Sequence, residues 1–314
     1  MLWSKKTNRT GLLNRRAAFE SLESRKVFAG NVIVAFNPAT GATSITGDAQ
    51  DNQVSVSPVA AGIRVQGRLG TTVNGAASVI LPGPALGNVA VNLLAGNDSI
   101  AIIDTYMASL SVQETTGADV INLDRARVRG NTVINTQSGN DIVKVNGLFQ
   151  GNVSINTGIQ DDQVTVSGKI GVLLVGATGQ LDERYVFGGV FGGSKALNVT
   201  TSSGNDRVSL LSLDVDGLAN INTGENDDIF RTQTVRVADQ LLLNTAGGAD
   251  RAFFQTLACP LVDVNTGAAD DLVRIDPFSL ANVNLFSLDG GTGIDTLDRG
   301  GLAIGIVVNF EILT

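Results

Sequence analysis

The chain contains no histidine, one cysteine and only 6 prolines among its 314 residues. The absence of histidine excludes Ser-His-Asp and Cys-His catalysis, zinc or haem held by histidine, and a histidine pH switch. The single Cys259 excludes an internal disulfide and a multi-thiolate metal site, and we expect it to be a buried, inert thiol. So little proline argues against collagen-like structure, and a hydrophobic content of 43% argues against wholesale disorder.

The charge is distributed unevenly along the chain. There are 22 Lys and Arg against 30 Asp and Glu, a formal net charge of −8. Residues 1–30 hold seven basic and two acidic residues (7 − 2 = +5), so the remainder carries 15 − 28 = −13. Because an acidic body repels phosphate backbones, we expect no nucleic-acid partner. The uncharged stretch 69–97 contains two prolines and alternates as strands do, so we expect no transmembrane segment.

The basic N-terminus carries a short motif. Residues 19–25 read F-E-S-L-E-S-R, and Val27-Phe28-Ala29 follows shortly after. The segment resembles the F-E-x-L-E-x-R stretch at the N-terminus of many exported planctomycete proteins, with Val-Phe in place of Leu-Leu. It lacks the apolar core of an ordinary secretory signal. The resemblance implies export and removal near Ala29, and the alternative interpretation is a basic arm of the folded chain.

A turn-like segment of the form N-T-x-x-G-x-D recurs along the chain. Clear copies span 135–141, 156–162, 222–228, 244–250 and 265–271. Copies with one or two changes span 92–98, 113–119 and 200–206, and weaker copies end at Asn52, Ala77, Glu183 and Asp295. The twelve final positions lie 21 to 25 residues apart, which indicates a repeat architecture.

Apolar residues alternate on both sides of each turn. Val143 and Val145 stand two and four residues after Asp141, and Ile155 and Val153 stand seven and nine before Asp162. Period-two spacing around a Gly/Asn/Asp turn predicts strand, turn, strand. The constant register favours stacking of like positions over an antiparallel meander. We therefore predict an all-β fold, a right-handed parallel β-helix (solenoid) of about 12 coils with roughly 22 residues each. A β-sandwich is the structural alternative.

The two ends of such a stack need covering, because exposed strand edges invite aggregation. Residues 31–36 are expected to form the opening strand, and residues 300–314 break the repeat and are expected to form closing strands. The predicted organisation is a basic export segment over 1–30, the β-helix over 31–299 and a C-terminal cap over 300–314.

The repeated turn has two interpretations. Gly and Asn tolerate positive φ, and Asp and Thr side chains accept hydrogen bonds from turn amides, so the motif can be purely structural. The other interpretation is calcium. Residues 290–298 match the G-G-x-G-x-D-x-U-x pattern of calcium-binding RTX β-rolls, although RTX repeats recur every nine residues rather than every 22. Stacking would place one acid of each coil in a column, where a hard cation would relieve repulsion. The expected calcium ligands are Asp162, Asp206, Asp228, Asp250, Asp271 and Asp295.

Catalysis finds little support in the sequence. Many right-handed β-helices process polysaccharides, but a fold by itself does not show a function. Arg125, Arg127 and Arg129 form an outward basic stripe that does not continue one coil on, so we interpret it as a solvated strand face. Residues 188–195 are the one notable loop, and we interpret them as an outward bulge rather than a partner site.

The sequence therefore favours a non-catalytic, exported rod at a cell surface or in a matrix. We expect it to be monomeric and to contact a surface or matrix polymer or protein, and the structural and the calcium-binding interpretations of the turn both stay open. A polysaccharide lyase or hydrolase is the alternative.

Overall fold

The computed structural model describes residues 30–171, 173–174, 185–186, 195–276, 280–281, 285–300 and 306–313. The proposed export motif and nearly all of the 188–195 loop lie outside the described residues, so the predictions made for them stay predictions. None of the described segments forms a helix with the length and apolarity needed to cross a membrane.

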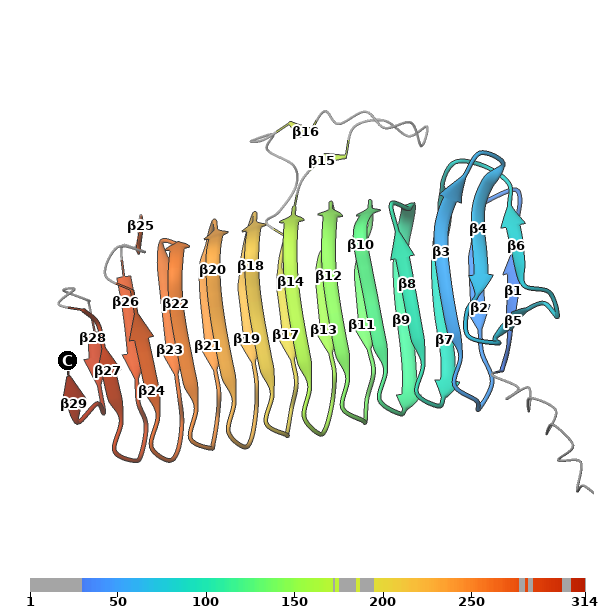
Figure 1. Cartoon of the computed structure of the whole chain (residues 1–314). Coiled ribbons are helices and arrows are strands. Elements are labelled where there is room, and N and C mark those ends of the chain that lie inside the picture. The colour runs from blue at the N-terminus through green and yellow to red at the C-terminus, as the bar shows by residue number, and fades with distance from the viewer. Residues whose placement is uncertain are drawn as a thin grey trace, which may run out of the picture.

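The described chain is an all-β parallel solenoid of about 8 turns with about 22 residues each. Figure 1 shows the turns side by side along a rod, from blue N-terminal strands to red C-terminal ones. Each turn contributes one strand before the N-T-x-x-G-x-D segment and one after it, and from β11 to β22 the strand after the segment is the longer of the two. Like strands pair in parallel, so the rod has two walls joined by the repeated turn.

The first wall holds the strands that precede the repeated turn. They are β2 (Thr43–Thr46), β7 (Leu86–Ala95), β9 (Tyr106–Thr116), β11 (Thr132–Asn135), β13 (Val153–Asn156), β17 (Leu197–Thr200), β19 (Ala219–Asn222), β21 (Gln240–Asn244), β23 (Leu261–Asn265), β26 (Leu285–Asp289) and β28 (Ile306–Val308).

The second wall holds the strands that follow the turn. They are β3 (Gln53–Val59), β8 (Ser99–Ile103), β10 (Val120–Val128), β12 (Ile142–Phe149), β14 (Gln163–Ile170), β18 (Arg207–Val215), β20 (Ile229–Val237), β22 (Arg251–Ala258), β24 (Leu272–Ile275), β25 (Leu280–Ala281), β27 (Thr296–Asp298) and β29 (Ile312–Leu313).

The alternation seen in the sequence decides which side chains form the core. Val143 of β12 pairs with Ile121 on one side and Val164 on the other, and all three are buried. Because side chains alternate between the two faces of a strand, identical register in every turn stacks apolar residues into columns. Aromatic rings also contact one another inside the core toward the C-terminal end, from different register positions: Phe230 lies 5.7 Å from Phe254, and Phe254 lies 5.6 Å from Phe286.

At least two of the twelve expected copies are not turns of the stack, which has about 8 turns, so the count of 12 is not confirmed. The copy at Glu183 is wrong because β13 pairs directly with β17, so the turn ending at Asp206 lies on the turn ending at Asp162. Glu183 itself lies outside the described residues. On either side of it, β15 (Leu173–Leu174) and β16 (Tyr185–Val186) pair with each other in antiparallel fashion, apart from the two walls.

The copy at Ala77 fails for a related reason. β2 and β3 pair directly with β7 and β8, so the turn at Asn52 lies on the turn at Asp98. The chain between them forms β4 (Gly62–Gly67), β5 (Thr72–Val73) and β6 (Ser78–Leu81), of which β4 pairs antiparallel with β3 and β6. Antiparallel strands alternate with the same period of two, so the sequence pattern did not separate them from a further coil.

Both expected end segments form strands. β1 (Asn31–Phe36) has the predicted bounds and pairs antiparallel with β2 and parallel with β5. At the other end, β28 and β29 continue the parallel stack, on β26 and β27 respectively.

Candidate functional site

The repeated turn has a fixed backbone geometry that aims its second and seventh residues into the wall. Its third and fifth residues adopt positive φ in most copies, as at Gly158 (φ 91°) and Gln160 (φ 84°). A side chain on Gly158 would collide with the Gln137 carbonyl oxygen of the neighbouring turn. Glycine at one of these two positions therefore lets successive turns approach to strand spacing. The threonine at the second position and the acid at the seventh are both buried, as Thr157 and Asp162 illustrate.

The buried acids form one continuous column, which we call the acid column. Its members are Asp98, Asp119, Asp141, Asp162, Asp206, Asp228, Asp250, Asp271 and Asp295. Each is at most 2% exposed. The Oδ1 atom of each aspartate accepts the backbone N–H of the column residue one turn before it, at 2.6–2.9 Å. The stacking of these acids, predicted from the repeat, is thus confirmed, and its chemistry is a side-chain ladder that joins successive turns.

The second oxygen of each of these carboxylates is buried without a hydrogen-bond partner. Burial disfavours the charged form, and it outweighs the hydrogen bonds that favour it. Burial raises the pKa of Asp162, Asp228 and Asp250 to about 7. The neighbouring threonine hydroxyl and the accepted N–H lower these pKa values by less than burial raises them. Burial raises the pKa of Asp98 and Asp119 to about 6. The same cause raises the pKa along the rest of the column, with further members at Asp141, Asp206, Asp271 and Asp295.

Neighbouring carboxylates of the column add repulsion to the cost of burial. Successive turns lie about 4.8 Å apart, and two charges at that distance repel by ~3–4 kcal/mol at an effective dielectric of 20. A proton on alternate acids or a cation between turns would remove this repulsion. We therefore expect the stability of the fold to depend on whether the carboxylates of the acid column are ionised.

The column offers calcium few ligands. One oxygen of each carboxylate is committed to a backbone N–H, which leaves one free oxygen per turn, whereas calcium takes 6–8 oxygen ligands. Within the described residues, no three His, Cys, Asp or Glu side chains are grouped so that they could hold a metal ion. The predicted ligands Asp162, Asp206 and Asp228 lie in adjacent turns, and Asp250, Asp271 and Asp295 continue the same column, so the residues are brought together in a line rather than around a centre.

Two glutamates make similar hydrogen bonds between turns and were not recognised in the sequence. Glu114 replaces the usual threonine at the second turn position, is fully buried, and accepts the Leu93 N–H at 2.8 Å through Oε2. Burial raises its pKa to about 8, and the nearby Asp119 and Asp98 add to the shift. Glu311 takes the next place in the ladder after Asp295 and accepts its N–H at 2.8 Å, also through Oε2.

A second, exposed ladder runs along the outside of the same turns. Asp161, Asp227 and Asp270 precede three members of the acid column and accept backbone N–H groups from Asn205, Ala249 and Ile294 of the next turn at 2.8 Å. Where two aspartates are adjacent in the sequence, the second therefore lies inside the wall and the first lies on its outer surface. The two ladders point in opposite directions along the rod.

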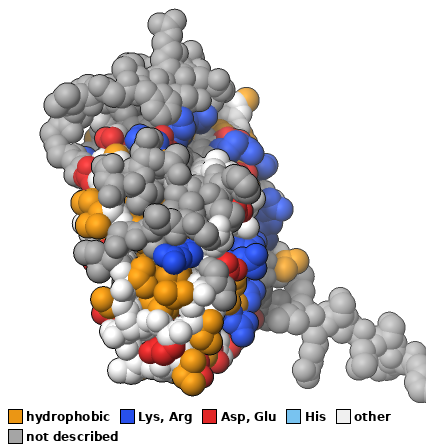
Figure 2. All heavy atoms as spheres, turned by 90° about the vertical axis from the view of Figure 1, so that its left-hand side faces the viewer, with side chains coloured by type: hydrophobic (Ala, Val, Ile, Leu, Met, Phe, Trp, Pro, Cys, Tyr) orange, Lys and Arg blue, Asp and Glu red, His pale blue; other side chains and the backbone are white. Residues whose placement is uncertain are grey.

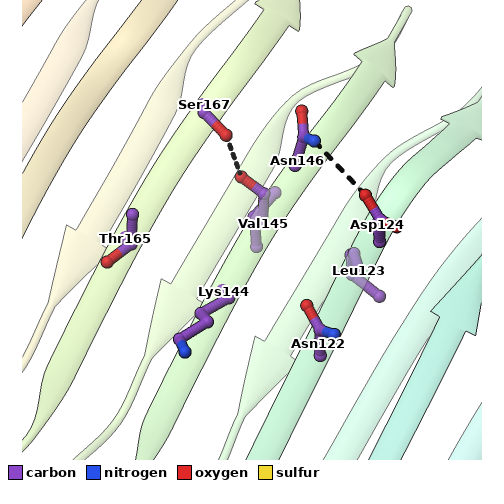
Figure 3. Close-up of a pocket in the computed structure, with 8 residues that line it drawn as sticks. All are labelled: Asn122, Leu123, Asp124, Lys144, Val145, Asn146, Thr165 and Ser167. Carbon is purple, nitrogen blue, oxygen red and sulfur yellow. Dashed lines mark hydrogen bonds between the residues drawn. The ribbon is translucent and has the colours of Figure 1, made fainter.

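A shallow hollow of about 250 Å³ lies on the outer face of β10, β12 and β14 (Figure 3). Its polar lining comes from Asn122, Asp124, Lys144, Asn146, Thr165 and Ser167. Asp124 is already engaged, since Arg125 lies 3.2 Å from its carboxylate and Asn146 donates to it at 3.5 Å. No acid of the hollow is therefore free to act alone as a general acid or base.

The predicted basic stripe is confined to one turn, as expected. Arg125 donates to Asp104 through Nε at 2.7 Å and Nη2 at 2.6 Å, which lowers the pKa of that carboxyl. Cys259 is buried, and its thiol donates to the Leu261 carbonyl at 3.0 Å. Burial raises the pKa of that thiol, in agreement with the expected inert cysteine.

Comparison with protein-family models finds no match for this chain, and comparisons with curated proteins and with solved structures find no significant match either.

Proposed function

We propose that this chain is a non-catalytic, exported, monomeric rod that serves as a structural or adhesion element of a cell surface or matrix. The observation that carries the proposal is the acid column. Its carboxylates have raised pKa values, and in many proteins such groups mark a catalytic site. Here they lie inside the wall, at most 2% exposed, and hold successive turns together.

A structural role also fits the shape of the molecule. Parallel turns give extended, flat outer faces that suit contact with a long polymer. The hollow on β10, β12 and β14 is shallow, and its only acid is engaged by a neighbouring guanidinium. The right-handed coil belongs to the same proposal and is supported by the general handedness of parallel crossovers.

Turnover assays test the non-catalytic part of the proposal. Purified protein is incubated with acidic and neutral polysaccharides, and new reducing ends and unsaturated products are measured. We expect none above buffer. Turnover that is lost in Asp124→Asn would instead establish the polysaccharide-processing alternative and place its site in the hollow.

Export is tested separately in the native host. Cell fractionation is expected to place the protein at the surface or outside the cell, and mass spectrometry is expected to find the mature chain beginning near residue 30. Protein that stays inside the cell with Met1 attached would contradict export, whatever the enzymatic result.

Calcium between turns is kept as a separate proposal with its own measurement. If calcium rather than protons neutralises the column, equilibrium dialysis with calcium alone shows stoichiometric binding and EDTA lowers the melting temperature at pH 8. If neither happens, protons rather than cations neutralise the acid column.

A further inference from the structure

Four arginines occupy the outer face of four successive turns of the second wall. They are Arg207 on β18, Arg231 on β20, Arg251 on β22 and Arg274 on β24, and all four are exposed. We call this set the arginine track. Figure 2, which looks at the C-terminal end of the rod, shows that many Lys and Arg side chains lie on one side of the molecule.

The strand register arranges the track in two columns. Arg207 and Arg251 both align with Ile229, one turn to either side of it, and Arg231 and Arg274 both align with Phe253. Residues two turns apart lie about 10 Å from each other along the rod, and the two columns are ~6–7 Å apart across the strand. The guanidinium groups therefore follow the rod axis in a zigzag, at intervals on the order of one or two sugar units.

Most of the track has no acidic partner. Within the described part of the chain, the only ion pair of the track joins Arg274 to Asp298 at 3.4 Å. By contrast, Arg236 on the same wall is paired with Asp214 at 2.8 Å. Within the described residues, Arg207, Arg231 and Arg251 thus make no ion pair with an acid, in a protein whose net charge is −8. Guanidinium groups bind carboxylate and sulfate oxygens through paired N–H donors, so this face is complementary to an anionic ligand.

An outward aromatic ring lies between two arginines of the track. Phe253 is partly exposed, whereas Phe254, its neighbour on β22, is fully buried in the core. The Arg231 guanidinium lies 6.0 Å from the centre of the Phe253 ring. A cation over a ring is a stable arrangement, and it leaves an apolar surface beside a row of charges. The face therefore offers both parts of a contact with an acidic sugar, a cation for its anionic group and a ring for its carbon skeleton.

We propose that the arginine track and Phe253 bind a linear anionic polysaccharide that lies along the rod axis. The inference rests on the proposed function, because it names the polymer that the surface element would contact. The anionic groups pair with Arg207, Arg231, Arg251 and Arg274, and a sugar ring packs on Phe253. Carboxylated and sulfated chains share this chemistry. The flanking acids Asp227 and Asp270 disfavour nucleic acid, whose charge is much denser than one group per sugar.

Binding is measured on the full chain by biolayer interferometry at 50 and 200 mM NaCl. The probes are polygalacturonate for carboxylates, dextran sulfate for sulfates, neutral dextran, and double-stranded DNA. We expect binding to at least one of the two acidic polysaccharides that weakens with salt, no binding to dextran, and weaker binding to DNA. The comparison of the two acidic probes identifies which anionic group is preferred.

Matched variants locate the surface. The fourfold variant R207Q/R231Q/R251Q/R274Q is expected to lose at least about tenfold in affinity, equivalent to ~1.4 kcal/mol. Arg236→Gln is the control, because Arg236 lies on the same strand as Arg231 but outside the track, and it is expected to stay within about twofold. Phe253→Ala is expected to weaken polysaccharide binding several-fold while binding of inorganic polyphosphate stays unchanged. Unchanged melting temperatures confirm that the variants are folded.

Several results would overturn the inference. They are failure to bind either acidic polysaccharide, equal loss in the fourfold variant and in Arg236→Gln, or DNA binding as tight as that of the polysaccharides. These outcomes are distinct from failure of the proposed function. An exported, inert rod that binds no polyanion defeats only the inference, whereas turnover or intracellular location defeats the proposed function and leaves the binding result standing.

Discussion

The aspartate that closes each turn uses its two oxygens differently. In Asp228, Oδ1 accepts the Asp206 N–H at 2.8 Å, while Oδ2 is buried without a partner. The hydrogen bond to Oδ1 satisfies a buried N–H donor. The unpaired Oδ2 places negative charge, when the carboxyl is ionised, in an interior that solvates it poorly. Asp228 thus joins two turns, and its burial makes the ionised form of its carboxyl less stable, which raises its pKa.

Substitutions at Asp228 separate these two effects. Asp228→Asn keeps an acceptor for the Asp206 N–H and places an amide near the Thr223 hydroxyl, so it is expected to change stability little at pH 6 and to stabilise the fold at pH 8. Asp228→Ala also removes the charge but leaves that N–H buried and unpaired, so it is expected to be less stable than Asp228→Asn by about 1–3 kcal/mol at both pH values. Urea denaturation at pH 6 and pH 8 measures the difference. Equal destabilisation by both variants would mean that the ladder bond contributes nothing.

Glu114 is the position where the turn departs most from its pattern. Its pKa of about 8 lies above the usual value near 4.5, so its proton stabilises the folded state at low pH and that stabilisation is lost as pH rises through about 8. Glu114→Gln keeps the acceptor for the Leu93 N–H and cannot ionise. We therefore expect the loss of stability between pH 6 and pH 9 to be smaller in the variant by about 2 kcal/mol or more. Parallel pH profiles for the two proteins would contradict this account.

At the scale of strands, the period of the sequence was enough to predict the parallel stack and the columns. Val143 and Val145 lie where the alternation placed them, and β1 has the expected bounds. The prediction of turns at Ala77 and Glu183 was wrong because alternation and spacing do not show which strand a segment pairs with. Glu114 and Glu311 were missed because each stands where the motif has another residue or has ended, so only the hydrogen bonds identify them.

Deleting the segment between β14 and β17 tests whether the parallel stack forms without it. In the neighbouring turns two or three residues connect the walls, as the three residues 150–152 do between β12 and β13. Gly171 and Ala196 already occupy the first and last of these three places, since they align with Gln150 and Asn152. Replacing residues 172–195 by one glycine is therefore expected to leave the melting temperature within a few degrees of the natural chain, by calorimetry.

The contacts across the junction explain this expectation. Val153 would still pair with Leu197, and Val164 with Val208. Short loops cost less closure entropy than long ones, so any change should be small and favourable. A broad or two-step transition in the shortened chain would show instead that residues 172–195 hold the two halves together.

At the scale of the whole molecule, the acid column runs through nearly all the turns, so its protonation is a collective property. Burial raises pKa values to about 6 or 7, against about 3.8 for an ordinary aspartate. The folded state therefore binds more protons than the unfolded state between about pH 4 and pH 7, and its stability falls as pH rises through that window. In EDTA, we expect the free energy of unfolding to be greater at pH 5 than at pH 8 by about 3 kcal/mol or more.

A matched pair of variants separates the column from the general acidity of the protein. Lowering the pH also reduces the net charge of −8, which would stabilise any acidic protein. D162N/D228N/D271N removes three carboxylates from the column, and D161N/D227N/D270N removes their exposed neighbours, one residue away in each turn. We expect the first to flatten the pH profile of unfolding and the second to leave it nearly parallel to that of the natural chain. Stability that rises from pH 5 to pH 8 in the natural chain would mean that the buried carboxylates are ionised and held by something other than protons.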